Sequence, residues 1–219
     1  MEGEKRNWFK DMTLKEKLQY IWDYYKIHIV IGLLLIYVLT MFTLSLINRK
    51  EYILNIALIG ERIDFDMLSQ FSNEVTKEII GDHAGKKEAS VDFYKLMRDY
   101  HGDLVLDPAS TQKLIARIAA KEIDVIILDK KTFDALAVQG AFLKLDGRLE
   151  GLNLNRYKVV KAVEDTNGVK KGIYGIYVNP DNKYLKKLGY DYHDKIIAIL
   201  SNSQHKDLSL KFLKWLLGG

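Results

Sequence analysis

The sequence predicts an α/β protein in which an N-terminal transmembrane helix precedes one α/β domain with a mixed sheet. Three observations lead to this prediction. No Asp, Glu, Lys or Arg occurs between Lys26 and Arg49. Strand-like and helix-like apolar segments alternate from residue 52 to residue 217, and charges of both signs are interspersed among them. We therefore expect an interfacial, cytoplasmic amphipathic helix in residues 1–26, a transmembrane helix in residues 27–48 and an extracytoplasmic α/β domain in residues 49–219.

The uncharged segment has the length of a membrane span. Residues 27–48 would extend roughly 33 Å as a helix, at about 1.5 Å per residue, and a hydrocarbon core is about 30 Å thick. Every backbone polar group in lipid needs an internal partner, which a helix provides. The alternative is a buried helix of a soluble domain, but buried helices are seldom this long without a charge.

The segment has the features of an uncleaved signal anchor. A cleavable signal peptide has a short basic head and an apolar core of about 7 to 15 residues. Here 26 residues precede the core, and Asn48-Arg49-Lys50 follows it. The chain contains no cysteine, which excludes an acylated lipoprotein, disulfides and thiolate metal sites. We expect a single-pass protein of the cell membrane.

Positive charges near the span favour a cytoplasmic N-terminus and an extracytoplasmic C-terminal domain. The bias is small, with four basic residues before the span and three after it. They are Lys10, Lys15, Lys17 and Lys26 on one side, and Arg49, Lys50 and Arg62 on the other.

A second helix pattern precedes the span. Thr13 and Glu16 have the spacing of a capping box, so a helix is expected to begin there. Its apolar residues recur at helical spacing, and aromatic residues lie where a membrane–water interface would begin. This pattern indicates an interfacial anchor, with docking of a partner helix as the alternative. The apolar and aromatic residues are Leu14, Leu18, Ile21, Trp22, Tyr24 and Tyr25.

The first half of the domain reads as alternating strands and helices. The patterns predict strands at 52–59 and within 89–96, a short extended piece at 104–106, and helices at 64–80 and 110–120. In the second helix, Ser110 is the expected N-cap, and Leu114, Ile115 and Ile118 are expected to face inward.

The second half begins with a nearly continuous apolar run at 123–128, the pattern of a parallel strand covered on both faces. A short helix at 131–139 closed by Gly140 follows, then an extended piece at 142–146. Strands at 157–163 and 172–178 are expected to form a hairpin through a turn at 166–168. A strand at 196–200 and a helix at 206–217 complete the domain.

Several of these segments resemble the extracellular solute-binding proteins of ABC importers. The resemblance is strongest in residues 112–129 (QKLIARIAAKEIDVIILD) and 139–146 (QGAFLKLD), and it continues in GIYV at 175–178, ILSNS at 199–203 and KFLKWL at 211–216. It extends over roughly residues 53–217. It implies an extracytoplasmic domain like a truncated periplasmic-binding-protein lobe. Such proteins close two lobes around a solute, and residues 147–195 are too few for a second lobe.

Candidate ligand-binding residues follow from the expected topology. In open α/β sheets, ligands bind beyond the carboxyl ends of parallel strands, where helix N-termini present free N–H groups. Tyrosines on the returning strand would offer aromatic surface and a hydroxyl. The alternative reading makes these residues helix caps and packing residues. The candidates are Gly60, Glu61, Ser110, Thr111, Asp129, Thr132, Tyr174 and Tyr177.

Catalytic and metal-binding patterns are scarce. The sequence lacks the nucleophile elbow, the zinc-protease motif, the P-loop and the dinucleotide-binding motif. His101-Gly102-Asp103 and His193-Asp194 bring no third ligand at a useful spacing. His28 lies at the mouth of the span and is read as an interfacial residue. We predict no catalytic residue, no metal site and no cofactor.

The expected function is that of a membrane-anchored extracytoplasmic binding module for a small solute or peptide. The alternative is a structural or regulatory accessory subunit of a membrane complex, with a membrane-protein partner and no solute. An enzyme with an unrecognised site ranks third. Nucleic-acid binding is unsupported, because the net charge is only +4 and the basic residues are scattered.

Overall fold

The computed structural model describes residues 13–47, 50–81, 85–152, 156–162, 171–179, 181–191 and 193–218. The chain divides into two compact units, Met1–Arg49 and Lys50–Gly219, which are described separately. The expected turn at 166–168 lies outside the described residues.

The described residues of the first unit form one long helix, α1 (Leu14–Ile47), preceded by Thr13. The predicted capping box is present, because the Glu16 carboxylate accepts the Thr13 N–H at 2.8 Å and the Thr13 hydroxyl accepts the Glu16 N–H at 3.4 Å. Within α1, Trp22–Leu46 includes a stretch with a mean hydropathy of 2.5. In the described part of the chain it is the one segment long and apolar enough to cross a membrane, and none of its most apolar stretch is buried in the protein.

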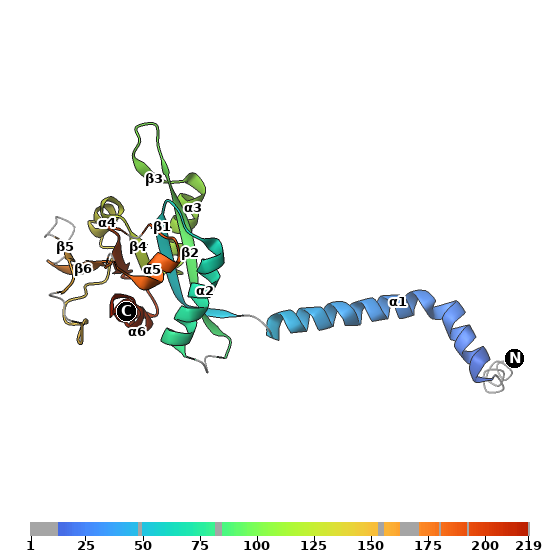
Figure 1. The fold of residues 1–219 in the computed structure, drawn as a ribbon. Helices are drawn as coiled ribbons and strands as arrows, with labels where there is room; N and C mark the ends of the chain where they lie inside the picture. The colour runs from blue at the N-terminus through green and yellow to red at the C-terminus, as the bar shows by residue number, and fades with distance from the viewer. Residues whose placement is uncertain are drawn as a thin grey trace. The chain divides into compact units, whose positions relative to one another are not determined.

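The second unit contains a seven-stranded mixed sheet of strand order β3-β2-β1-β4-β7-β6-β5 (Figure 1). β1 pairs in parallel with β2 and β4, and the other pairings are antiparallel. This arrangement confirms the predicted mixed sheet. The strands are β1 (Glu51–Gly60), β2 (Lys87–Arg98), β3 (Leu104–Leu106), β4 (Val125–Leu128), β5 (Val159–Ala162), β6 (Gly172–Tyr177) and β7 (Ile196–Ile199).

Helices cover both faces of the sheet and enclose two apolar cores. One core lies under α2, α5 and α6, and the other lies under α3 and α4. β4 is buried along its whole length, as its unbroken apolar run predicted. The helices are α2 (Phe65–Val75), continued by a π-helical turn η1 (Thr76–Ile80), α3 (Pro108–Ala119), α4 (Lys130–Ala137), α5 (Lys183–Lys187) and α6 (Lys206–Gly218).

Two details of α3 correct the sequence predictions. Its N-cap is Asp107, whose carboxylate accepts the N–H groups of Ala109 and Ser110, and not Ser110 itself. Pro108 fits the first helical position because its missing N–H would be unpaired there, and this moves the helix start two residues earlier. Ile115 was expected to face inward, but it is 63% exposed, because it is about 100° around the helix from the buried Leu114.

Hydroxyl groups occupy part of the outer edge of β2. β1 pairs with one edge of β2, whereas on the outer edge β3 pairs only with Leu96–Arg98, so the outer main chain of β2 before Leu96 has no strand beside it. The Ser72 hydroxyl donates to Ala89 O at 2.7 Å, and Thr76 Oγ1 accepts the Ala89 N–H at 2.9 Å. Further along, Ser110 Oγ accepts the Lys95 N–H at 2.9 Å, and Lys95 O accepts the Asp107 N–H at 3.0 Å.

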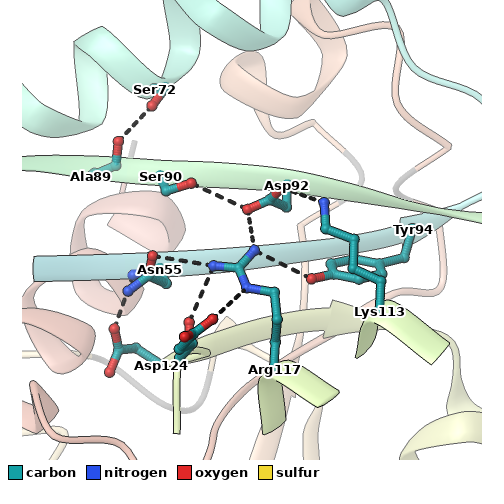
Figure 2. Close-up of polar contacts among 10 residues, drawn as sticks. Asn55, Ser72, Ala89, Ser90, Asp92, Tyr94, Lys113, Arg117 and Asp124 are labelled. Atoms are coloured by element: carbon teal, nitrogen blue, oxygen red, sulfur yellow. Dashed lines mark hydrogen bonds and ion pairs between the residues drawn. The ribbon is translucent and has the colours of Figure 1, made fainter. Parts of the chain in front are cut away.

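A polar cluster fastens α3 to the sheet (Figure 2). The Arg117 guanidinium pairs with the Asp92 carboxylate on β2 and lies 3.4 Å from both the Tyr94 hydroxyl and Asn55 Oδ1. Lys113 donates to the same carboxylate at 2.7 Å. Nearby, the fully buried Asp124 accepts the Asn55 N–H at 2.9 Å and the Ser203 hydroxyl at 2.6 Å. These contacts join β1, β2, α3 and the start of α6.

The cluster predicts an acid-sensitive stability. Burial alone would raise the pKa of Asp92, but hydrogen bonds and attraction from Lys113 and Arg117 leave this pKa lowered. A carboxylate whose pKa is lower in the folded state stabilises the fold above its unfolded pKa, near 3.8, and this contribution is lost as the pH falls through the folded pKa. Asp92→Asn should therefore cost on the order of 2 kcal/mol at pH 7, and less at pH 3.

Urea unfolding of residues 50–219 at both pH values measures this difference. Asp134→Asn, which removes an exposed partner of Lys130, is the matched control and should cost under about 0.5 kcal/mol. Equal costs for Asp92→Asn at pH 7 and pH 3 would contradict the assignment.

Candidate functional site

The loops that carry most of the predicted ligand residues meet at one edge of the sheet. β1, β2 and β4 run parallel, so their carboxyl ends lie together. Gly60 ends β1 and Glu61 follows it, and Asp129 follows β4. Gly60 is in register with Lys95, whose main chain bonds Ser110 and Asp107 at the start of α3. These three loops therefore lie at the same edge of the sheet.

The polar groups at the start of α3 are occupied internally. The Ser110 hydroxyl donates to the Asp107 carboxylate at 2.6 Å, and the Thr111 hydroxyl donates to Asp107 O at 2.9 Å. The hydrogen bonds from Ser110, followed by that from Ala109, lower the pKa of Asp107. These residues hold the helix N-terminus and the edge of β2, although the N-cap is Asp107 and not Ser110, which the helix-cap alternative named.

The start of α4 is closed in the same way. Asp129 is the N-cap, and its carboxylate accepts the Thr132 N–H at 2.9 Å and the Thr132 hydroxyl at 2.8 Å. Both residues thus act as helix-start residues. Their polar atoms are directed at each other.

Tyr190 and Asp191, from the connection between α5 and β7, fill the crevice beyond β1 and β4. The Tyr190 hydroxyl donates to Ile59 O at 2.6 Å and lies 3.4 Å from Ile127 O. Asp191 Oδ1 accepts the Glu61 N–H at 3.1 Å. Burial, and then the nearby carboxylates Asp191 and Asp129, raise the pKa of Tyr190, so its hydroxyl remains a neutral donor. Two side chains of the domain itself, Tyr190 and Asp191, therefore fill this crevice.

Gly60 makes room for these two side chains. A Cβ at this position would lie 2.2 Å from Asp191 Oδ1 and 2.6 Å from a Tyr190 ring carbon. The sequence predicts Gly60 as a ligand residue at the crevice. It does not predict Tyr190 and Asp191 there, because nothing local in the sequence connects residues about 130 positions apart.

The two predicted tyrosines of β6 have different environments. Tyr174 is buried in the core under α3 and α4, so it offers no ligand surface. Tyr177 is partly buried and lines an open cavity of about 280 Å³, which we call the Tyr177 pocket. Lys158 Nζ lies 4.4 Å from the centre of the Tyr177 ring. The other lining residues are Arg156, Tyr157, Val178, Asn179 and Asp194.

The structure thus separates the eight predicted residues into a filled crevice, two helix starts, a core residue and one pocket residue. The Tyr177 pocket combines aromatic surface with two cationic side chains and one carboxylate, a lining that suits a small anionic or aromatic group. Among the described residues, no group of three or more His, Asp or Glu side chains is arranged to hold a metal ion.

No protein-family model matches the chain, and no curated protein matches it. Three solved structures are similar to part of it. They are an ABC substrate-binding protein from Listeria monocytogenes in complex with cycloalternan (16% identity, TM-score 0.36), an extracellular solute-binding protein family 1 member from Alicyclobacillus acidocaldarius (17%, 0.31) and an N-glycan transport solute-binding protein from Streptococcus pneumoniae (17%, 0.32).

The matches cover 58%, 58% and 57% of this chain, and 28%, 28% and 24% of those proteins. The chain therefore spans only about a quarter of their length. Similarity of this extent carries no argument about ligand or activity.

The filled crevice predicts a cost for enlarging Gly60. Gly60→Ala should lower the free energy of unfolding by about 1 to 3 kcal/mol, because the new methyl group must displace Tyr190 or Asp191. Denaturant unfolding of residues 50–219 measures this cost. Gly218→Ala is the control, since a Cβ there has nothing within 4 Å. A Gly60→Ala variant as stable as the control would contradict the described packing.

Proposed function

We propose that this chain is a single-pass membrane protein whose C-terminal domain works outside the cytoplasm as a binding module and not as an enzyme. One observation carries the anchoring: Trp22–Leu46 is helical throughout, it carries no charge after Lys26, and none of its most apolar stretch is buried in the protein. The remainder of the chain forms a separate compact unit with its own cores. A helix of this kind is stable in lipid, where its apolar side chains are not exposed to water.

The proposed ligand is a small solute or a peptide, and the proposed site is the Tyr177 pocket. Its volume of about 280 Å³ lies at the lower end of small-ligand sites, which suits a small molecule or one peptide side chain. The Tyr177 ring and the cations of Lys158 and Arg156 favour an anionic or aromatic group.

The second candidate is a structural or regulatory subunit that binds a membrane protein and no solute. The filled crevice favours it, because Tyr190 and Asp191 occupy the place where an open α/β sheet would receive a ligand. The hydroxyl and carboxylate groups at the starts of α3 and α4 are likewise engaged within the chain.

Location is tested on intact cells. The full chain should remain in the membrane pellet after alkaline carbonate extraction, and external protease should remove the C-terminal domain while leaving a membrane-embedded N-terminal fragment. The mass of the purified protein should include residues 1–49. A soluble mature protein that lacks them would show that the apolar helix is a cleaved signal. A protected domain in the membrane pellet would show the opposite orientation.

Ligand class is tested by thermal unfolding of residues 50–219 against amino acids, sugars, organic acids and short peptides. A ligand at 100 times its Kd stabilises the folded state by about 2.7 kcal/mol, which should raise Tm by roughly 5–10 °C. Tyr177→Ala should abolish the shift, whereas Val138→Ala, at an exposed position, should keep it. If no compound raises Tm and in-cell crosslinking joins the domain to one membrane protein, the accessory function is correct.

A further inference from the structure

α1 is longer than a bilayer requires. Its 34 residues correspond to about 51 Å, whereas the hydrocarbon core is about 30 Å thick. The turns from Leu14 to Tyr25 precede the uncharged segment, so they lie outside the hydrocarbon of the proposed span. Figure 1 shows that α1 is bent within its N-terminal half and is not a straight rod.

This N-terminal part of α1 has one apolar face. Leu14, Leu18 and Trp22 are 82%, 68% and 57% exposed, and at 100° per residue they lie within about 80° of one another around the helix. Gln19 and Asp23 lie about 100° and 140° around the helix from Leu18. Exposing an apolar stripe of two helical turns to water is unfavourable, so lipid or another protein surface is expected to cover it.

Aromatic side chains collect in the turns next to the uncharged segment, with Tyr25 on the side of Leu18 and the Tyr20–Tyr24 pair on another side of the helix. Tyr20 and Tyr24 stack with their ring centres 6.0 Å apart, Tyr24 meets Tyr25 edge-on at 5.3 Å, and Tyr25 meets His28 at 6.1 Å. Aromatic rings with polar tips are enriched at membrane–water interfaces because they place an apolar body and a hydroxyl in adjacent phases.

We propose that the segment Leu14–Tyr25 lies along the phospholipid surface, with Leu14, Leu18 and Trp22 in the boundary between headgroups and acyl chains. The proposal rests on the proposed span, with which the segment is continuous as a single helix. If the helix instead continued straight along the bilayer normal, Leu18 would lie roughly 14 Å from Ile27, the first residue of the uncharged segment. The apolar face of Leu14–Tyr25 would then be in water. Lipid is the occupant that this continuity and the aromatic rings favour over a partner helix.

The test uses the full chain in phosphatidylcholine–phosphatidylglycerol vesicles. Because the chain has no cysteine, single-cysteine variants can carry one nitroxide label each. Leu18→Cys and Gln19→Cys form a matched pair, because they differ by only about 1.5 Å along the helix axis but lie about 100° apart around it. Leu35→Cys reports on the proposed span. A water-soluble nickel complex and oxygen report the exposure of each label to water and to lipid.

The expected result is lipid exposure at position 35, lipid exposure at position 18 and several-fold greater collision with the nickel complex at position 19. Equal water exposure at positions 18 and 19, with position 35 in lipid, would overturn the surface helix and leave the span intact. Water exposure at position 35 would overturn the span itself. Efficient disulfide formation between unlabelled Leu18→Cys chains would show that a second copy covers this face, and would also overturn the proposal.

Discussion

The burial of β1 and β4 on both faces is the constraint on which the rest of the domain depends. Leu54, Ile56 and Leu58 of β1 point into one core, while Ala57 and Ile59 point into the other. β4 divides its side chains in the same way, so helices must cover both sides of this parallel pair. The loops that follow β1 and β4 therefore lie at the carboxyl edge of the sheet. Their polar groups must find hydrogen-bond partners there.

At that edge the domain differs from an open receptor. Tyr190 bonds the last carbonyl before Gly60, and Asp191 bonds the first N–H after it, so two adjacent residues satisfy both sides of the end of β1. A ligand for this crevice would have to displace a buried ring and a carboxylate that also lies 3.4 Å from Lys195 Nζ. A ligand in the Tyr177 pocket, or a partner protein on the domain surface, could bind without displacing Tyr190 or Asp191.

Much of the fold could be predicted from local patterns. The apolar runs of β1 and β4 and the capping box of α1 are signals within a few residues, and all three are confirmed. The cap of α3 was misplaced because Asp107 and Ser110 are both favourable caps and only the proline position separates them. The crevice contents were not predicted, because the Tyr190–Ile59 hydrogen bond joins residues 131 positions apart, and hydrophobic periodicity carries no information about such pairings. The Arg117–Asp92 pair was missed for the same reason.

The hydroxyl groups along the outer edge of β2 affect how neighbouring molecules behave. Proteins held in a membrane meet one another at high local density, and an edge strand with free main-chain groups is a template for intermolecular pairing. Ser72 and Thr76 occupy the main chain of Ala89, and Ser110 and Asp107 occupy that of Lys95. Between Ala89 and Lys95, only the outer main-chain groups around Val91 and Phe93 lack such a bond. This segment is shorter than the six or seven residues typical of intermolecular β-sheets. The occupied main chain at Ala89 and Lys95 thus limits the pairing of β2 with a strand of another molecule.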